Sequence, residues 1–118
     1  MNNLISWVEI PAKNFERATE FYNKVLNLKL EVADYGIEKM ACFPGGEGAI
    51  SFAPNFEPSS GGVLVSLNAS KQFDAVLKRI AENGGEVKQG KTKIQAEGRG
   101  YFATFLDTEG NKLSLYGG

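Results

Sequence analysis

An aromatic ring and a carboxylate stand two residues apart near the start of the chain. Trp7 and Glu9 lie in the run Leu4–Ile10, whose composition is typical of a β-strand. Because side chains alternate between the two faces of a strand, Trp7 and Glu9 share one face. An indole beside a carboxylate favours planar or cationic ligands, through stacking, cation–π attraction and charge-assisted hydrogen bonds. The structural alternative is that the ring fills space and the carboxylate pairs with a lysine or caps a strand.

The chain contains no histidine and a single cysteine, Cys42. Catalysis by Ser-His-Asp or Cys-His groups, histidine general bases and zinc sites with a histidine ligand are therefore excluded within this chain. One cysteine cannot close an internal disulfide, which suits a reducing cytoplasm. Because Cys42 lies in an apolar run, we interpret it as a small buried hydrophobe rather than a nucleophile.

Composition indicates one globular domain without nucleic-acid or membrane partners. A chain of 118 residues buries about two thirds of its surface on folding, which is enough for an unaided core. The net charge of −1 supplies no positive field for a phosphate backbone. The N-terminal sequence has no basic and apolar signal pattern, and no stretch reaches the length of a membrane span. We expect a soluble, cytoplasmic protein.

A first amphipathic helix is predicted over Phe15–Leu26, where apolar side chains recur at three- and four-residue steps. Asn14 precedes this stretch and is a suitable N-cap. Glu20 and Lys24 are one turn apart and form a favourable ion pair in a helix.

A second amphipathic helix is predicted from the apolar stripe of Phe73–Ala81. Ser70 stands where its N-cap is expected, and Asp74 and Lys78 repeat the charge pairing of the first helix. Gly84 and Gly85 are expected to end it.

Short runs of strand type surround both helices in the same order, one before each helix and three after it. The runs are Leu4–Ile10, Leu28–Ala33, Ile37–Phe43, Ala49–Phe52, Val63–Leu67, Glu86–Ile94, Tyr101–Leu106 and Lys112–Tyr116. Asp107 and Gly110 occupy the first and last positions of a type I turn, which predicts the last hairpin. The chain therefore reads as an α+β fold of two βαβββ modules.

The predicted first module covers residues 1–53, the linker residues 54–62 and the second module residues 63–118. Modules of this size cannot each build a core, so we expect them to share one sheet or to pair through a second chain. Either arrangement gives a concave sheet surface.

Three stretches resemble one known family. Residues Glu9–Tyr22, Asp74–Val87 and Asp107–Leu115 are similar to the first strand and helix, the second helix and the last hairpin of the vicinal oxygen chelate superfamily. This group contains the glyoxalases, bleomycin resistance proteins and extradiol dioxygenases. The resemblance implies that each module curls its sheet into half of a cup, and that a homodimer completes two ligand sites.

In metal-dependent members of that superfamily, the first and fourth strands of both modules supply histidine, glutamine and glutamate ligands. The resemblance places these positions on Trp7, Ser51, Val65 and Ser114. An indole N–H has no lone pair for a metal, valine has no donor atom, and serine hydroxyls are weak neutral ligands. We therefore expect no metal and no cofactor.

The expected ligand site lies in the cup. Its candidate residues are Trp7, Glu9, Ser51, Tyr101, Ser114 and Tyr116. The register of the strand at 101–106 is open: either Tyr101, Ala103 and Phe105 or Phe102 and Thr104 face the ligand. Our leading hypothesis is a metal-free, homodimeric protein that sequesters or senses a small organic molecule with an aromatic or cationic group, like a bleomycin resistance protein.

Two alternatives remain open at this point. One is a metal-independent lyase or isomerase of glyoxalase type, in which Glu9 is the general base and Tyr101 or Tyr116 donates a proton. The other is an interaction module whose cup is filled by its own side chains.

Overall fold

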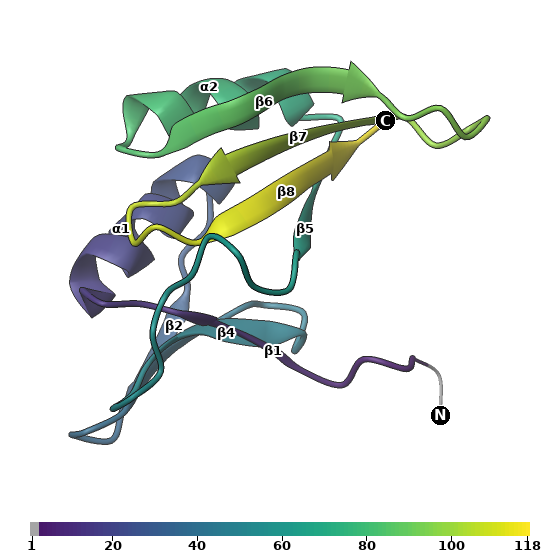
Figure 1. The fold of residues 1–118 in the computed structure, drawn as a ribbon. Coiled ribbons are helices and arrows are strands. Elements are labelled where there is room, and N and C mark those ends of the chain that lie inside the picture. The colour runs from purple at the N-terminus through teal and green to yellow at the C-terminus, as the bar shows by residue number, and fades with distance from the viewer. Residues whose placement is uncertain (1–2) are drawn as a thin grey trace.

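The computed structural model describes residues 3–118. Met1 and Asn2, where the predicted first module begins, lie outside the described residues. The elements follow the order βαβββ twice, as predicted (Figure 1). They are β1 (Val8–Pro11), α1 (Phe15–Leu26), β2 (Glu31–Asp34), β3 (Lys39–Cys42), β4 (Gly48–Phe52), β5 (Ser66–Ser70), α2 (Phe73–Glu82), β6 (Glu86–Lys93), β7 (Tyr101–Leu106) and β8 (Lys112–Gly117).

The strands form two four-stranded mixed sheets, with the orders β1-β4-β3-β2 and β5-β8-β7-β6. In each sheet the strand that precedes the helix runs parallel to the last strand of its module, and the other pairs are antiparallel. Within residues 3–118 no strand of one sheet pairs with a strand of the other. Of the two expected arrangements, one sheet shared within the chain is not formed by these residues, and pairing through a second chain stays a prediction; the two sheets share a core.

Helix α1 begins and ends where the sequence predicts. The side chain of Asn14 accepts a hydrogen bond of 3.1 Å from the backbone N–H of Arg17, which satisfies one donor of the first turn. The ammonium of Lys24 lies 2.7 Å from the carboxylate of Glu20, as expected from their spacing. Asn27 then takes the left-handed conformation, with φ 54°, and ends the helix.

The predicted N-cap of α2 is wrong. Ser70 is the last residue of β5 and has φ 50°, and the ladder between β5 and β8 is irregular between Asn68 and Ser70. Gln72 occupies the cap position and makes no capping bond with its side chain. Ser70, which the sequence pattern assigned to the start of the helix, therefore belongs to the irregular end of β5.

The predicted ion pair between Asp74 and Lys78 is also wrong. Asp74 lies 3.3 Å from Lys91 of the neighbouring strand β6, and Lys78 lies 4.0 Å from Glu82 one turn later. The ammonium of Lys91 also lies 4.6 Å from the centre of the Tyr101 ring. A tertiary contact thus replaces the local helical pair.

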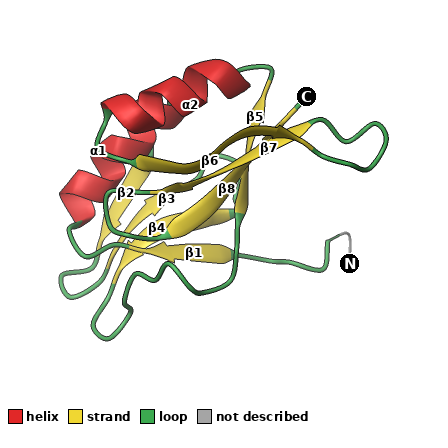
Figure 2. Ribbon diagram, turned by 45° about the horizontal axis from the view of Figure 1, so that its top comes forward, coloured by secondary structure: helices red, strands yellow, loops and turns green. Residues whose placement is uncertain are grey.

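One cluster of buried side chains is formed by residues of both helices and of the helix-facing sides of both sheets. Its largest fully buried members are Tyr22, Phe21, Phe105, Ile50, Ile80, Leu115 and Val25. Figure 2 shows the two helices lying next to each other on one side of the strands. The two modules are therefore joined through their helix layers.

Among the described residues, neither helix is long and apolar enough to cross a lipid bilayer.

The turn between β7 and β8 holds the start of α1. The carboxylate of Glu109 accepts hydrogen bonds from the backbone N–H groups of Lys13 and Asn14, at 2.8 and 2.6 Å. The guanidinium of Arg17 lies 2.7 Å from the same carboxylate. Burial alone raises the pKa of Glu109, but the hydrogen bonds from Arg17, Asn14 and Thr108 outweigh it and lower that pKa. A carboxylate of the second module thus stabilises the positive end of a helix in the first.

Asn111, the residue after that turn, ties three segments together. Its side-chain amide donates hydrogen bonds to the backbone carbonyl of Pro11 at 2.7 Å and to Asp107 at 3.0 Å. Its amide oxygen accepts a hydrogen bond of 3.1 Å from the backbone N–H of Ser59, in the segment between the modules.

The predicted turn from Asp107 to Gly110 is confirmed by a hydrogen bond of 3.2 Å from the backbone N–H of Gly110 to the backbone carbonyl of Asp107.

Candidate functional site

The structure brings two of the predicted site residues into direct contact. Ser51 Oγ donates a hydrogen bond of 2.8 Å to Glu9 Oε1, which joins β4 to β1. Ser51 is 2 % exposed, whereas Glu9 is exposed to solvent. Both side chains lie on the face of the first sheet that points away from α1, which we call outer face one. A buried hydroxyl therefore orients an exposed carboxylate.

Trp7 directly precedes β1 and is 41 % exposed. The alternation of β1 is as expected, because Ile10 is buried under the helix and Val8 packs against the core. Trp7 itself lies outside the strand, so the expectation that its indole shares the side of Glu9 stays a prediction. Outer face one offers an oriented carboxylate, and Trp7 is an accessible aromatic side chain next to the start of its strand.

Outer face one carries negative charge. Across residues 3–118 none of the ion pairs includes Glu9. The register places Ser51 opposite Met40 and Cys42 opposite Glu31, so the carboxylate of Glu31 belongs to the same face. This face can therefore attract a positively charged group.

The second sheet has a corresponding outer face, which we call outer face two. Ser114 lies opposite Ser66 and Thr104, and Tyr116 lies opposite Phe102, so these side chains share one side of the sheet. Ser114 is 4 % exposed and Tyr116 is 37 % exposed. Outer face two is therefore polar around Ser114 and aromatic around Tyr116.

The register of β7 decides between the two alternatives left by the sequence. Phe102 and Thr104 belong to outer face two, whereas Tyr101 points to the core side, where it packs near Lys91. The structure therefore brings Tyr101 neither to Ser114 and Tyr116 nor to Glu9. A proton donor paired with Glu9 would have to come from Tyr116, which belongs to the other sheet.

The metal-ligand positions implied by the resemblance need one correction. Val65 precedes β5 and packs on the core side, as Leu67 does, so the residues on outer face two are Ser66 and Asn68. The alignment through the helix therefore selects the core side of β5, whose ladder is irregular between Asn68 and Ser70. Asn68 Oδ1 accepts a hydrogen bond of 2.8 Å from the backbone N–H of Ser70.

The corrected residues, like the predicted ones, do not fit a divalent metal. Indole, serine and asparagine groups at these positions supply no anionic or imidazole ligand. Within the described part of the chain, no three His, Cys, Asp or Glu side chains are grouped so that they could hold a metal ion.

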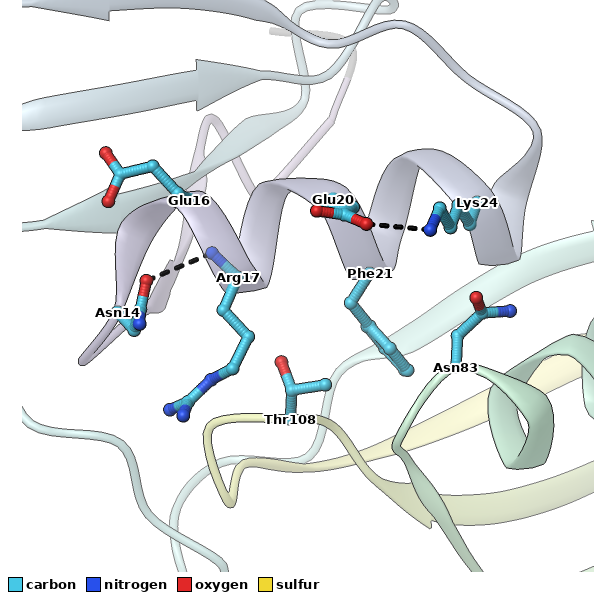
Figure 3. A pocket seen from close by; sticks show the side chains of 8 residues that line it. All are labelled: Asn14, Glu16, Arg17, Glu20, Phe21, Lys24, Asn83 and Thr108. Atoms are coloured by element: carbon cyan, nitrogen blue, oxygen red, sulfur yellow. Dashed lines mark hydrogen bonds and ion pairs between the residues drawn. The ribbon is translucent and has the colours of Figure 1, made fainter.

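A groove beside α1 was not predicted from the sequence. Its volume is about 380 Å³, and Figure 3 shows Arg17 and Thr108 on its two sides, with Glu16 turned away. Its charges are matched within the chain, because Lys24 binds Glu20 and Arg17 binds Glu109. The groove is therefore part of the contact between the modules rather than a site with charge left for a ligand.

The chain matches the family model of the glyoxalase/bleomycin resistance protein/dioxygenase superfamily over residues 4–115. It therefore belongs to this superfamily. A comparison with curated proteins found no significant match.

Solved structures with the same fold cover nearly the whole chain. A glyoxalase/bleomycin resistance protein from Albidiferax ferrireducens has a TM-score of 0.73 at 20% identity, covering 98% of this chain and 99% of that one. A glyoxylase/bleomycin resistance protein/dioxygenase domain from Frankia has a TM-score of 0.74 at 16% identity, covering 100% and 99%. A fosfomycin resistance protein from Listeria monocytogenes has a TM-score of 0.68 at 20% identity, covering 100% and 93%. At these identities the likeness shows the α+β fold of two βαβββ modules.

Proposed function

We propose that this protein binds a small organic molecule without a metal, and that it sequesters or senses a ligand with an aromatic or cationic group. The observation that carries the proposal is the exposed carboxylate of Glu9, held by Ser51 and not paired with a basic side chain of the described chain. The indole of Trp7 supplies a stacking surface beside it. A ligand with an ammonium group and a planar ring would gain binding free energy from both side chains. The carboxylate would form a charge-assisted hydrogen bond with the ammonium group, and the indole would stack on the ring.

The residues proposed to contact the ligand are those of the two outer faces. Glu9 and Ser51 would bind the charged part, Trp7 would stack on the planar part, and Ser114 and Tyr116 would line the opposite half of the cup. Tyr101 has no place in this proposal because its side chain belongs to the core side of β7.

We propose a homodimer as the unit that closes the cup. Both outer faces lie outside the shared core, and within residues 3–118 no hydrogen bond joins Glu9 or Ser51 to outer face two. Exposed apolar side chains near the starts of the two modules support an interface, since Leu4 is 82 % and Val63 is 91 % exposed. The lone cysteine is consistent with a cytoplasmic location.

Calorimetric titration with matched compounds tests the proposal. Aromatic ammonium compounds and neutral isosteres of the same ring systems are titrated into the wild type, Glu9→Gln and Glu57→Gln. We expect the cations to bind more tightly than their isosteres, and Glu9→Gln to weaken only the cations, by about tenfold. Glu57 is exposed in the segment between the modules, so Glu57→Gln is the matched control. Equal binding to the wild type and Glu9→Gln contradicts the proposed role of Glu9.

A further inference from the structure

A second cavity lies at the seam between the modules, on the core side of β1. Its volume is about 330 Å³, near the lower end of the range of small-molecule pockets. It is bordered by β1, the end of α1, the hairpin between β3 and β4, and β5. Its apolar lining consists of the exposed Pro44 and six further side chains, Val8, Leu26, Leu28, Phe43, Val65 and Leu67.

These six side chains are only partly buried, although each packs against the core cluster. They come from both modules, and sites between structural units are a common place for ligand pockets. A ligand in this cavity would remove apolar surface of both modules from water at once, which is favourable in proportion to the area covered. The cavity is therefore suited to the apolar body of a small molecule.

The polar groups at the cavity determine the charge of its ligand. Among the described residues that line it, Glu47 is the single charged one, and Ser66 and Asn68 are neutral. No ion pair of the described residues includes Glu47. Val8 and Glu47 also line a neighbouring cavity of about 520 Å³, so the opening continues past the carboxylate. An ammonium group at the mouth would meet the carboxylate while its apolar part stays inside.

We propose that this seam cavity is a second ligand site, which takes a small amphipathic molecule with a short hydrocarbon body and a single ammonium group. At β1 the cavity uses the side opposite to the proposed cup, whereas at β5 it also reaches Ser66 and Asn68 of outer face two. Val8 points into the seam, whereas Glu9 belongs to outer face one. A seam ligand would contact both modules and the strand that carries Glu9.

Methyl-group NMR with hexylammonium, hexanol and hexanoate tests the site, because these probes share one chain and differ in charge. We expect hexylammonium to shift the methyl resonances of Val8, Leu28 and Val65 in a saturable way, with hexanol weaker and hexanoate weakest. Glu47→Gln should weaken hexylammonium by about tenfold and leave hexanol unchanged. Glu57→Gln serves as the matched control.

Three results would overturn the site. They are an absence of seam shifts at millimolar hexylammonium, equal affinity for all three probes, and seam shifts that follow protein concentration rather than probe concentration. The last would mean that a second copy covers the seam. Leu28→Trp, checked for folding by its amide spectrum, should abolish the shifts by filling the cavity.

The two proposed sites can fail separately. Glu9→Gln should not change hexylammonium binding at the seam, and Glu47→Gln should not change binding of aromatic cations to the outer face. Loss of seam binding in Glu9→Gln would show that hexylammonium occupies the outer face instead, and would contradict a separate seam site.

Discussion

The hydroxyl of Tyr22 donates a hydrogen bond of 2.6 Å to Oδ2 of Asp107, 85 residues later and in the other module. Both residues are buried, and Asp107 also accepts bonds from the backbone N–H groups of Glu109 and Asn111. Burial and the neighbouring carboxylate raise the pKa of Tyr22 well above its usual value, so the hydroxyl keeps its proton. This bond ties α1 to the last hairpin.

Tyr22→Phe should destabilise the fold by about 2 kcal/mol, because the buried carboxyl group of Asp107 loses one of its hydrogen-bond donors. Urea unfolding should show a lower midpoint with an unchanged slope. Tyr35→Phe is the matched control, because Tyr35 is 70 % exposed. Removal of its hydroxyl group should change stability by less than about 0.5 kcal/mol. Equal midpoints for the two variants would contradict a stabilising contact at Asp107.

Glu109→Gln should destabilise the protein at neutral pH and have little effect in acid. In the folded protein the pKa of Glu109 lies below its ordinary value. The contribution of its carboxylate to the free energy of unfolding is therefore present above about pH 5 and is lost as the pH falls through the folded pKa. Because Arg17 is 49% exposed, solvent screening limits this contribution to about 1 kcal/mol. Unfolding free energies measured from pH 3 to pH 7 check it. A difference between wild type and variant that is constant over this range would refute the assignment.

The sequence predicted the first helix well because all its signals are local. The stripe of Phe15–Leu26, the cap Asn14 and the pair of Glu20 with Lys24 lie within one or two turns of each other. In the part of the chain that the structure describes, no other ion pair includes Glu20 or Lys24. At α2 a tertiary contact competes with the local pair, because Lys91 of β6 takes Asp74 away from its helical neighbour.

The site was predicted less completely than the fold. Strand alternation was enough to place Glu9 away from Ile10, and the contact between Glu9 and Ser51 follows from the parallel pairing of their strands. The side of β7 that Tyr101 occupies depends on its register with β8, which no local pattern reveals. The seam cavity arises only when two modules meet, so no sequence signal marked it.

Gly48→Ala should disrupt the first sheet. A Cβ at this position would overlap the backbone oxygen of Val8, where β1 and β4 pair. We expect a loss of roughly 3 kcal/mol, because backbone atoms cannot yield without breaking the ladder. Gly61→Ala meets no atom within 4 Å and is the control. Similar melting temperatures for the two variants would mean that the strands pair less closely than described.

Ile5→Glu should weaken the proposed homodimer. Ile5 is 66 % exposed next to Leu4, so a charge there would cost little in a monomer but much in an apolar interface. Sedimentation equilibrium should show a dimer for the wild type and a monomer for the variant. Ile37→Glu is matched, since Ile37 is 73 % exposed in the turn between β2 and β3, and it should remain dimeric. A monomeric wild type at micromolar concentration would exclude the homodimer.

The most direct test of ligand binding on outer face one is an NMR titration of the wild type with the tightest aromatic ammonium compound from the calorimetric panel. We predict saturable shifts of the Trp7 indole N–H and of the Glu9 and Ser51 amides, and their loss in Glu9→Gln with the rest of the spectrum intact. Shifts that spare all three residues at saturating ligand would contradict the account, as would a panel in which no compound perturbs them at submillimolar concentration.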